Sequence, residues 1–163
     1  QINSLKFNDI SVGDIIEINK KKKPCIRLSS RSILKAKRIL PYRTPFNNVT
    51  IAIKKEKFIE LNGYPNLRTA EDWLFMGKVI KNNLRLSCEH QILVEIEKDE
   101  LFILRRKGRI VFNDIKSCIN NLHSLKLINR YQKFISINIQ RILRLHTPEK
   151  ILFIIYYILR KNF

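Results

Sequence analysis

Two adjacent carboxylates, Glu71 and Asp72, stand at the predicted start of a helix and are the residues best suited to acid–base chemistry. The positive end of a helix dipole favours an ionised carboxylate, and an ionised carboxylate can accept a proton from a hydroxyl group. The same pair also suits a structural role, in which Thr69 is the N-cap and Asp72 completes a variant capping box. The local sequence fits both interpretations.

The other reactive side chains form no comparable pattern. Cys25, Cys88 and Cys118 are odd in number and far apart, so free thiols are expected, and neither a disulfide framework nor a zinc site is. The three histidines lack a spacing suited to a metal or a catalytic triad, and no Asp-x-Asp motif occurs. We therefore assign no metal ligand within this chain.

The charge of the chain indicates an anionic partner. The 163 residues contain 32 Lys and Arg against 14 Asp and Glu, a formal net charge of +18. Such a surface attracts nucleic acid, acidic lipid headgroups or diphosphate groups. The basic residues are spread along the chain, and the sequence shows no helix-turn-helix, zinc spacing or RNP-like aromatic strand. A basic nucleic-acid-binding domain remains the alternative class.

Hydrophobic periodicity predicts alternating strands and helices, followed by helices alone. Near the C-terminus, Ile135, Ile137 and Ile139 alternate with period two, which also fits a strand. Gly63 is predicted as the left-handed C-terminal cap of the helix before it. The predicted strands are 14–19, 24–28, 48–54, 84–86 and 92–96, and the predicted helices are 29–40, 55–61, 71–82, 110–127, 131–145 and 148–159.

Three short motifs occur in order: residues 43–50 read RTPFNNVT, residues 62–64 read NGY and residues 71–73 read EDW. This order resembles the second half of the catalytic domain of family-2 glycosyltransferases, the inverting sugar transferases of bacterial polysaccharide synthesis. Members that build capsule, O-antigen and lipooligosaccharide typically read Arg-x-Pro-Phe-Asn-His-x-Thr-Val, Gly-Gly-Tyr and Glu-Asp-Tyr-x-Leu-Trp. Here Asn48 replaces the histidine, Asn62 the first glycine, and Trp73 the tyrosine.

The resemblance implies an α/β fold. Residues 1–108 would be the acceptor-side part of a GT-A domain, a mixed sheet flanked by helices, and residues 109–163 a helical C-terminal extension. The implied reaction is inverting transfer of a sugar from a nucleotide-diphosphate sugar donor to a bacterial surface glycan or lipid-linked acceptor. Asp72 would be the general base and Glu71 would orient the acceptor or the loop. The implied substrate-binding residues are Arg43, Asn47, Asn48, Gly63, Tyr64, Trp73, Arg105 and Arg106.

Several of these residues also have an ordinary structural explanation. Arg43 and Asn47 suit turn chemistry around Pro45, and a turn aromatic such as Tyr64 often packs on the core. Arg105 and Arg106 match diphosphate oxygens bidentately but also suit a basic surface loop. The family commonly has Arg-Arg-Gly-Gly at that loop, where this chain has Lys107 in place of the first glycine.

The family's nucleotide-binding half, with its Asp-x-Asp metal motif, has no counterpart in this sequence. We therefore expect the chain to be part of a longer protein, and a divalent metal, Mg²⁺ or Mn²⁺, to be held mainly outside it. A truncated, non-enzymatic remnant of a glycosyltransferase is a further alternative.

The apolar run Ile151–Leu159 bears on location. A transmembrane helix needs about 20 apolar residues, so a core helix or an interfacial helix is expected instead. Acceptors in this family are often lipid-linked. The resemblance thus implies a cytoplasmic protein, peripheral on the inner face of the membrane, with an anionic membrane surface as a candidate partner and no specific nucleic acid.

Overall fold

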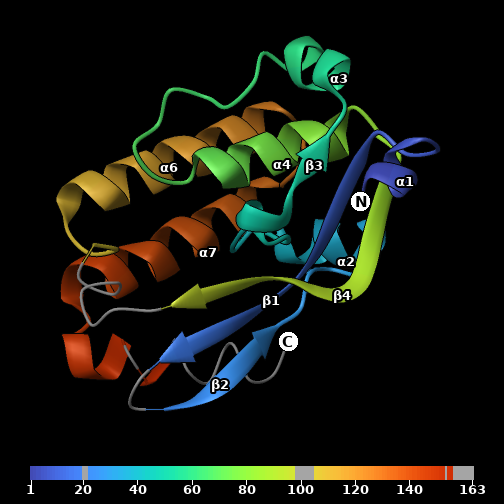
Figure 1. The fold of residues 1–163 in the computed structure, drawn as a ribbon. Helices are drawn as coiled ribbons and strands as arrows, with labels where there is room; N and C mark the ends of the chain where they lie inside the picture. Colours follow the sequence, from blue (N-terminus) through green and yellow to red (C-terminus); the bar gives the residue numbers. More distant parts are fainter. Residues whose placement is uncertain (20–21, 98–104, 153, 156–163) are drawn as a thin grey trace.

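A computed structural model describes residues 1–19, 22–97, 105–152 and 154–155 (Figure 1). It has an α/β architecture with a four-stranded mixed sheet and several helices, which confirms the predicted fold class at that level. The elements in chain order are α1 (Ile2–Leu5), β1 (Ile10–Asn19), β2 (Lys22–Arg27), α2 (Ile33–Ile39), the 3-10 helix η1 (Asn48–Thr50), β3 (Ala52–Ile53), α3 (Lys55–Glu60), α4 (Glu71–Lys81), β4 (Leu86–Glu97), α6 (Arg109–Ser124), α7 (Arg130–Arg141) and the π-helix η2 (Ile142–His146).

Strand β1 is the centre of the sheet. It pairs antiparallel with β3 at its N-terminal end and antiparallel with β2 at its C-terminal end, and it runs parallel to β4 along most of its length. Because Ile10 pairs with both Ile53 and Leu86, β3 and β4 lie on opposite sides of β1. The predicted strands 14–19 and 24–28 thus form the β1–β2 hairpin.

The predicted strand 84–86 is wrong over its first two residues, because β4 begins at Leu86. From there β4 continues as one bent strand through the predicted strand 92–96. Between the pairs Val12–Cys88 and Asp14–Ile92, β4 advances four positions while β1 advances two, so β4 bulges there. The polar run Glu89-His90-Gln91 occupies the bulge and interrupts the apolar pattern. That interruption is why the sequence predicted two separate strands.

Helices α4, α6 and α7 lie together beside the sheet (Figure 1). Buried residues of α4 and α6 join those of the strands in one hydrophobic core, which contains Ile10 and Phe75 as well as Ile119 and Leu122. A partly buried isoleucine of α7 packs against this core. Residues on both sides of the expected boundary at 108 therefore share one core. Helices α4 and α6 pack closely at Gly77, because an added Cβ there would lie 2.4 Å from Leu122 Cδ2.

The predicted strand 48–54 is wrong over its first half. Residues Asn48–Thr50 form η1, and only Ala52 and Ile53 are extended as β3. The hydroxyl of Thr50 donates to the Asn47 carbonyl at 2.8 Å and accepts from the backbone N–H of Gly13 at 3.0 Å. This side-chain bonding closes a turn where β-branched composition favoured a strand.

The predicted helix 29–40 begins later, at Ile33, with Ser32 as its N-cap. Ser29 does not cap the helix, because its backbone N–H donates to Asp14 at 2.9 Å and its hydroxyl to the Gly13 carbonyl at 2.6 Å. The ambiguous stretch 131–145 is helical, as α7 and η2. A capping box between Asn129 and Gln132 starts it.

The C-terminal helix is described only in part. Residues 149–152 and 154–155 are helical, and the rest of the predicted helix 148–159 lies outside the described residues. Within the described part of the chain, every helix is too short or too polar to cross a membrane.

Candidate functional site

The acid pair lies at the start of α4, as predicted, but the capping box does not form. Ala70 is the N-cap, and it adopts a left-handed conformation with φ of 67°. The Thr69 hydroxyl instead donates to Asp114 of α6 at 3.3 Å. A non-glycine residue in this region costs about 1–2 kcal/mol, so the start of α4 is a strained turn held by its surroundings.

One oxygen of the Asp72 carboxylate has a backbone partner. Oδ1 accepts from the N–H of Trp73 at 2.7 Å, which satisfies one of the free N–H groups at the helix start. Burial raises the pKa of Asp72, while the Trp73 N–H and the guanidinium groups of Arg27 and Arg106 act to lower it. Desolvation thus outweighs the stabilisation of the ionised carboxylate that is expected at a helix N-terminus.

Glu71 shares this electrostatic environment. Burial raises its pKa, the charges of Asp72 and Asp114 raise it further, and Arg106 opposes them. Three carboxylates and at least one arginine therefore interact at the start of α4. A group whose neutral form is favoured in this way binds a proton more strongly than an ordinary surface carboxylate.

Two arginines act on the acid pair, and a third lies near one of them. Arg27 is the last residue of β2, Arg106 lies just before α6, and Arg43 follows α2. Burial lowers the pKa of Arg43, and the nearby charge of Arg27 lowers it further. Arg27 was not among the predicted site residues. Its position at the end of a predicted strand was the available signal, but the motifs drew attention to later residues.

Tyr64 and Asn48 contact each other. The Tyr64 hydroxyl donates to Asn48 Oδ1 at 2.8 Å, while the ring lies 4.7 Å from the ring of Phe75, centroid to centroid. Burial raises the pKa of Tyr64, and the charges of Asp72 and Glu71 raise it further. The ring therefore packs on the core, and the hydroxyl side of the residue faces the site.

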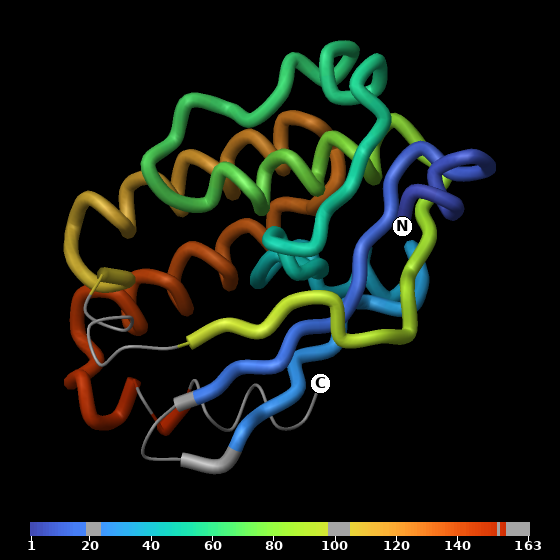
Figure 2. The backbone as a smooth tube through the Cα atoms, in the orientation of Figure 1, coloured from blue at the N-terminus to red at the C-terminus, as the bar shows by residue number. Residues whose placement is uncertain are grey.

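Gly63 belongs to the Schellman motif that ends α3. Its N–H donates to the Phe58 carbonyl at 2.9 Å, and the N–H of Asn62 donates to the Ile59 carbonyl at 2.8 Å. Asn62 and Gly63 both have positive φ, so the first left-handed residue is Asn62 and not Gly63 as predicted. The connection then follows a long arc before entering α4 (Figure 2).

Two predicted substrate contacts are buried. Asn47 is 2% exposed, and its side-chain nitrogen donates to the carbonyls of Gly13 and Arg27, each at 3.0 Å. Trp73 is 5% exposed, and its indole N–H donates to the Leu40 carbonyl at 2.7 Å. Neither side chain presents a free surface to a ligand in this structure. Both instead hold the loops around the site through these hydrogen bonds.

The arginine loop before α6 is anchored by η2. Arg144 donates from Nη1 to the Arg106 carbonyl at 2.9 Å, and its own carbonyl accepts from the Gly108 N–H at 3.1 Å. The Arg105 side chain is exposed, whereas Arg106 contributes to the pKa of both acids. The two neighbouring arginines are therefore not equivalent.

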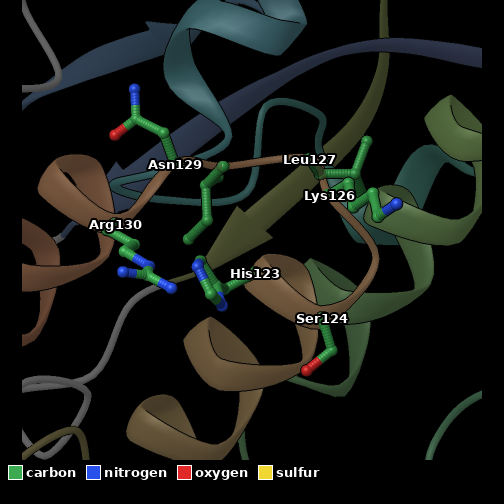
Figure 3. Close-up of a pocket in the computed structure, with 7 residues that line it drawn as sticks. His123, Ser124, Lys126, Leu127, Asn129 and Arg130 are labelled. Carbon is green, nitrogen blue, oxygen red and sulfur yellow. The ribbon is translucent and has the colours of Figure 1, made fainter.

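An open hollow of about 670 Å³ lies elsewhere, between the end of α6 and the start of α7 (Figure 3). It is lined by His123, Ser124, Lys126, Leu127, Ile128, Asn129 and Arg130. None of the predicted site residues lines it, so the candidate site rests on the charged groups at the start of α4. Among the described residues, no group of three or more His, Cys, Asp or Glu could hold a metal ion.

Comparison with known proteins gives no relative: no family model, curated protein or solved structure matches this chain. The site is therefore interpreted from its own geometry and chemistry.

Proposed function

We propose that this chain is the acceptor-side half of an inverting, family-2-like glycosyltransferase with Asp72 as its general base. One observation supports this most strongly: Asp72 and Glu71 lie within electrostatic reach of Arg27, Arg106 and Tyr64, residues from three other segments. A simple helix cap needs no such convergence. A site for a polar, anionic substrate does.

The proposed step is a single in-line displacement. Asp72 Oδ1 is engaged by the Trp73 N–H, so the second oxygen takes the proton of the acceptor hydroxyl. As that O–H bond breaks, the acceptor oxygen bonds to the anomeric carbon. The bond between that carbon and the phosphate oxygen breaks at the same time, and its electron pair leaves with the nucleoside diphosphate. Because attack comes from the face opposite the leaving group, the configuration is inverted.

The raised pKa of Asp72 assists this role. A base with a higher pKa accepts the proton more readily, provided that it is ionised at the working pH. The neighbouring charges of Arg27 and Arg106 favour the ionised form, while burial supplies the increased proton affinity. The proposed role of Glu71, whose pKa is raised as well, is to orient the acceptor or the loop.

The arginines suit the leaving-group side of the reaction. Negative charge develops on the diphosphate as the bond to the sugar breaks, and guanidinium groups stabilise such charge through bidentate hydrogen bonds. Arg106 fits this role best, because it lies near the acids and its loop is anchored by Arg144. A divalent metal is expected for the intact enzyme. The described residues offer no cluster to hold it, and the proposed step uses none.

The net charge of +18 favours one rival, a nucleic-acid-binding domain. That rival gives no role to the converging acids. Binding to random DNA measured from 50 to 200 mM salt separates the two, because a domain that makes six or more phosphate contacts loses roughly a thousandfold in affinity over that range.

The direct test uses the natural gene product in a transfer assay. Labelled nucleotide-diphosphate hexoses are offered with lipid-linked glycan acceptors, and the product linkage is read by NMR. The proposal expects a product with inverted anomeric configuration. A product with retained configuration contradicts it, as does high-affinity, salt-dependent DNA binding without any transfer.

A further inference from the structure

The C-terminal helices connect two loops of the proposed site through a continuous chain of hydrogen bonds. Gln140 donates from Nε2 to the Tyr42 carbonyl at 3.1 Å, and its Oε1 accepts from Arg144 Nε at 3.2 Å. Arg144 then donates from Nη1 to the Arg106 carbonyl at 2.9 Å. The chain thus runs from the residue before Arg43 to the backbone of Arg106.

The bonds at each end are reinforced. At one end, Ser136 donates to the Pro41 carbonyl at 2.5 Å, one turn of α7 before Gln140. At the other end, the Arg144 carbonyl accepts from the Gly108 N–H at 3.1 Å, so Arg144 holds its loop at two points. Loops 41–42 and 106–108 are therefore both tied to the segment from α7 to η2.

Packing alone does not explain these residues. Gln140 is 5% exposed, and burying an amide costs free energy unless its polar atoms are bonded. A leucine would fill similar space without that cost, yet it would leave the Tyr42 carbonyl and Arg144 without these bonds. Arg144 lies in a π-helical turn, a form that is rare and frequently occurs at functional sites.

We propose that Gln140 and Arg144 are positioning residues that hold the loops of Arg43 and Arg106 in the geometry that binds a diphosphate group. This inference rests on the proposed function, and it makes the C-terminal extension part of the site. Preorganised loops bind more tightly because less conformational entropy is lost on binding. Arg43 and Arg106 contact the ligand, while Gln140 and Arg144 act only through them.

The test measures the affinity of the folded protein for inorganic pyrophosphate by calorimetry. Arg144→Lys keeps the charge but cannot reproduce both side-chain bonds, and Gln140→Leu keeps the volume but removes the bonds. Each is expected to weaken binding about tenfold, the effect of one lost hydrogen bond to a charged group. The double variant is expected to lose less affinity than the product of the two single losses, because both residues belong to the same chain of hydrogen bonds.

Asn138→Ala is the matched control. Asn138 lies on the same helix, and within the described residues its side chain bonds to the Phe134 carbonyl alone, at 2.8 Å. Pyrophosphate affinity is therefore expected to stay at the wild-type value. If Gln140→Leu fails to fold, Gln140→Glu replaces it. Glutamate still accepts from Arg144 but cannot donate to Tyr42.

Wild-type affinity in a cooperatively melting Arg144→Lys protein overturns the inference, as does a wild-type protein that binds no pyrophosphate. The proposed function fails separately. Weakened pyrophosphate binding in the variants without sugar transfer by the wild type upholds the positioning role and rejects the transferase. Sugar transfer by the wild type, together with unchanged pyrophosphate affinity in Arg144→Lys, upholds the transferase and rejects the positioning role.

Discussion

The Tyr64 hydroxyl donates a hydrogen bond of 2.8 Å to Asn48 Oδ1, and this bond joins the loop after α3 to the start of η1. The two residues are sixteen positions apart and come from two of the three motifs that suggested the function. The Tyr64 ring is held in place by Phe58 and Phe75, at centroid distances of 5.7 and 4.7 Å. The bond therefore fixes Asn48 against a rigid aromatic cluster.

Tyr64→Phe tests the value of this bond. The ring packing remains and only the hydroxyl is lost, so the free energy of unfolding is expected to fall by no more than about 1 kcal/mol. In a transfer assay we expect a severalfold rise in KM for the acceptor. Asn48→Ala should act similarly, and the double variant should be no worse than either single one. Strictly additive losses would show that the two residues act independently.

Gly77→Ala tests the contact between α4 and α6. Alanine is the better helix former by about 1 kcal/mol, but its Cβ would lie 2.4 Å from Leu122 Cδ2, and Leu122 is fully buried. We expect a net loss of about 1–3 kcal/mol in denaturant unfolding, the usual cost of overpacking. Leu122→Val in the same chain should recover part of it. A more stable Gly77→Ala protein would mean that α4 and α6 pack less closely than described.

The interactions of Asp9 with basic side chains make the stability of the fold depend on pH. Hydrogen bonds from Arg85 lower the pKa of Asp9 to about 2 from its ordinary 3.8, and Lys54 lies 3.8 Å away. The stabilisation by Asp9 is complete above the pKa that this residue has in the unfolded chain. It is lost as the pH falls from about 4 towards 2. Denaturant midpoints measured over this range should fall more steeply for the wild type than for Asp9→Asn. Parallel curves for the two proteins would contradict the assignment.

The sequence predicted helices and long strands best where one pattern dominated. α4 was predicted because Trp73, Met76 and Ile80 recur along one helical face, and all three are buried in the structure. The strand at 48–54 was wrong because the side chain of Thr50 bonds to Gly13, thirty-seven positions away. Local propensity carries no information about such a partner.

The candidate site, like the fold, was predicted from the sequence only in part. The motifs identified Asp72, Glu71 and Arg106, whose charges do interact in the structure. Arg27 lies outside the motifs, and its charge acts on Asp72 only because the fold places the end of β2 near the start of α4. The sequence also could not show that Trp73 is buried, since the same aromatic suits a core position and a ligand contact.

Arg106→Gln tests the electrostatic coupling between the arginine loop and the base. Arg106 lowers the pKa of Asp72, so its removal should raise that pKa. A general base works only when ionised, and the acid limb of the pH profile of kcat/KM should therefore move to higher pH. Arg106→Lys keeps the charge and should leave the limb near its wild-type position. A limb that stays in place in Arg106→Gln would exclude this coupling.

The most direct test of the account is Asp72→Asn in the natural gene product, with turnover and stability measured together. Asparagine can still accept from the Trp73 N–H through Oδ1, so the helix start keeps its bond. Burial raises the pKa of Asp72, which means that the ionised carboxylate costs stability at neutral pH. We predict that turnover falls by about 10²–10⁴ while the melting temperature is unchanged or higher. Near-wild-type turnover in a folded Asp72→Asn protein would contradict the central claim.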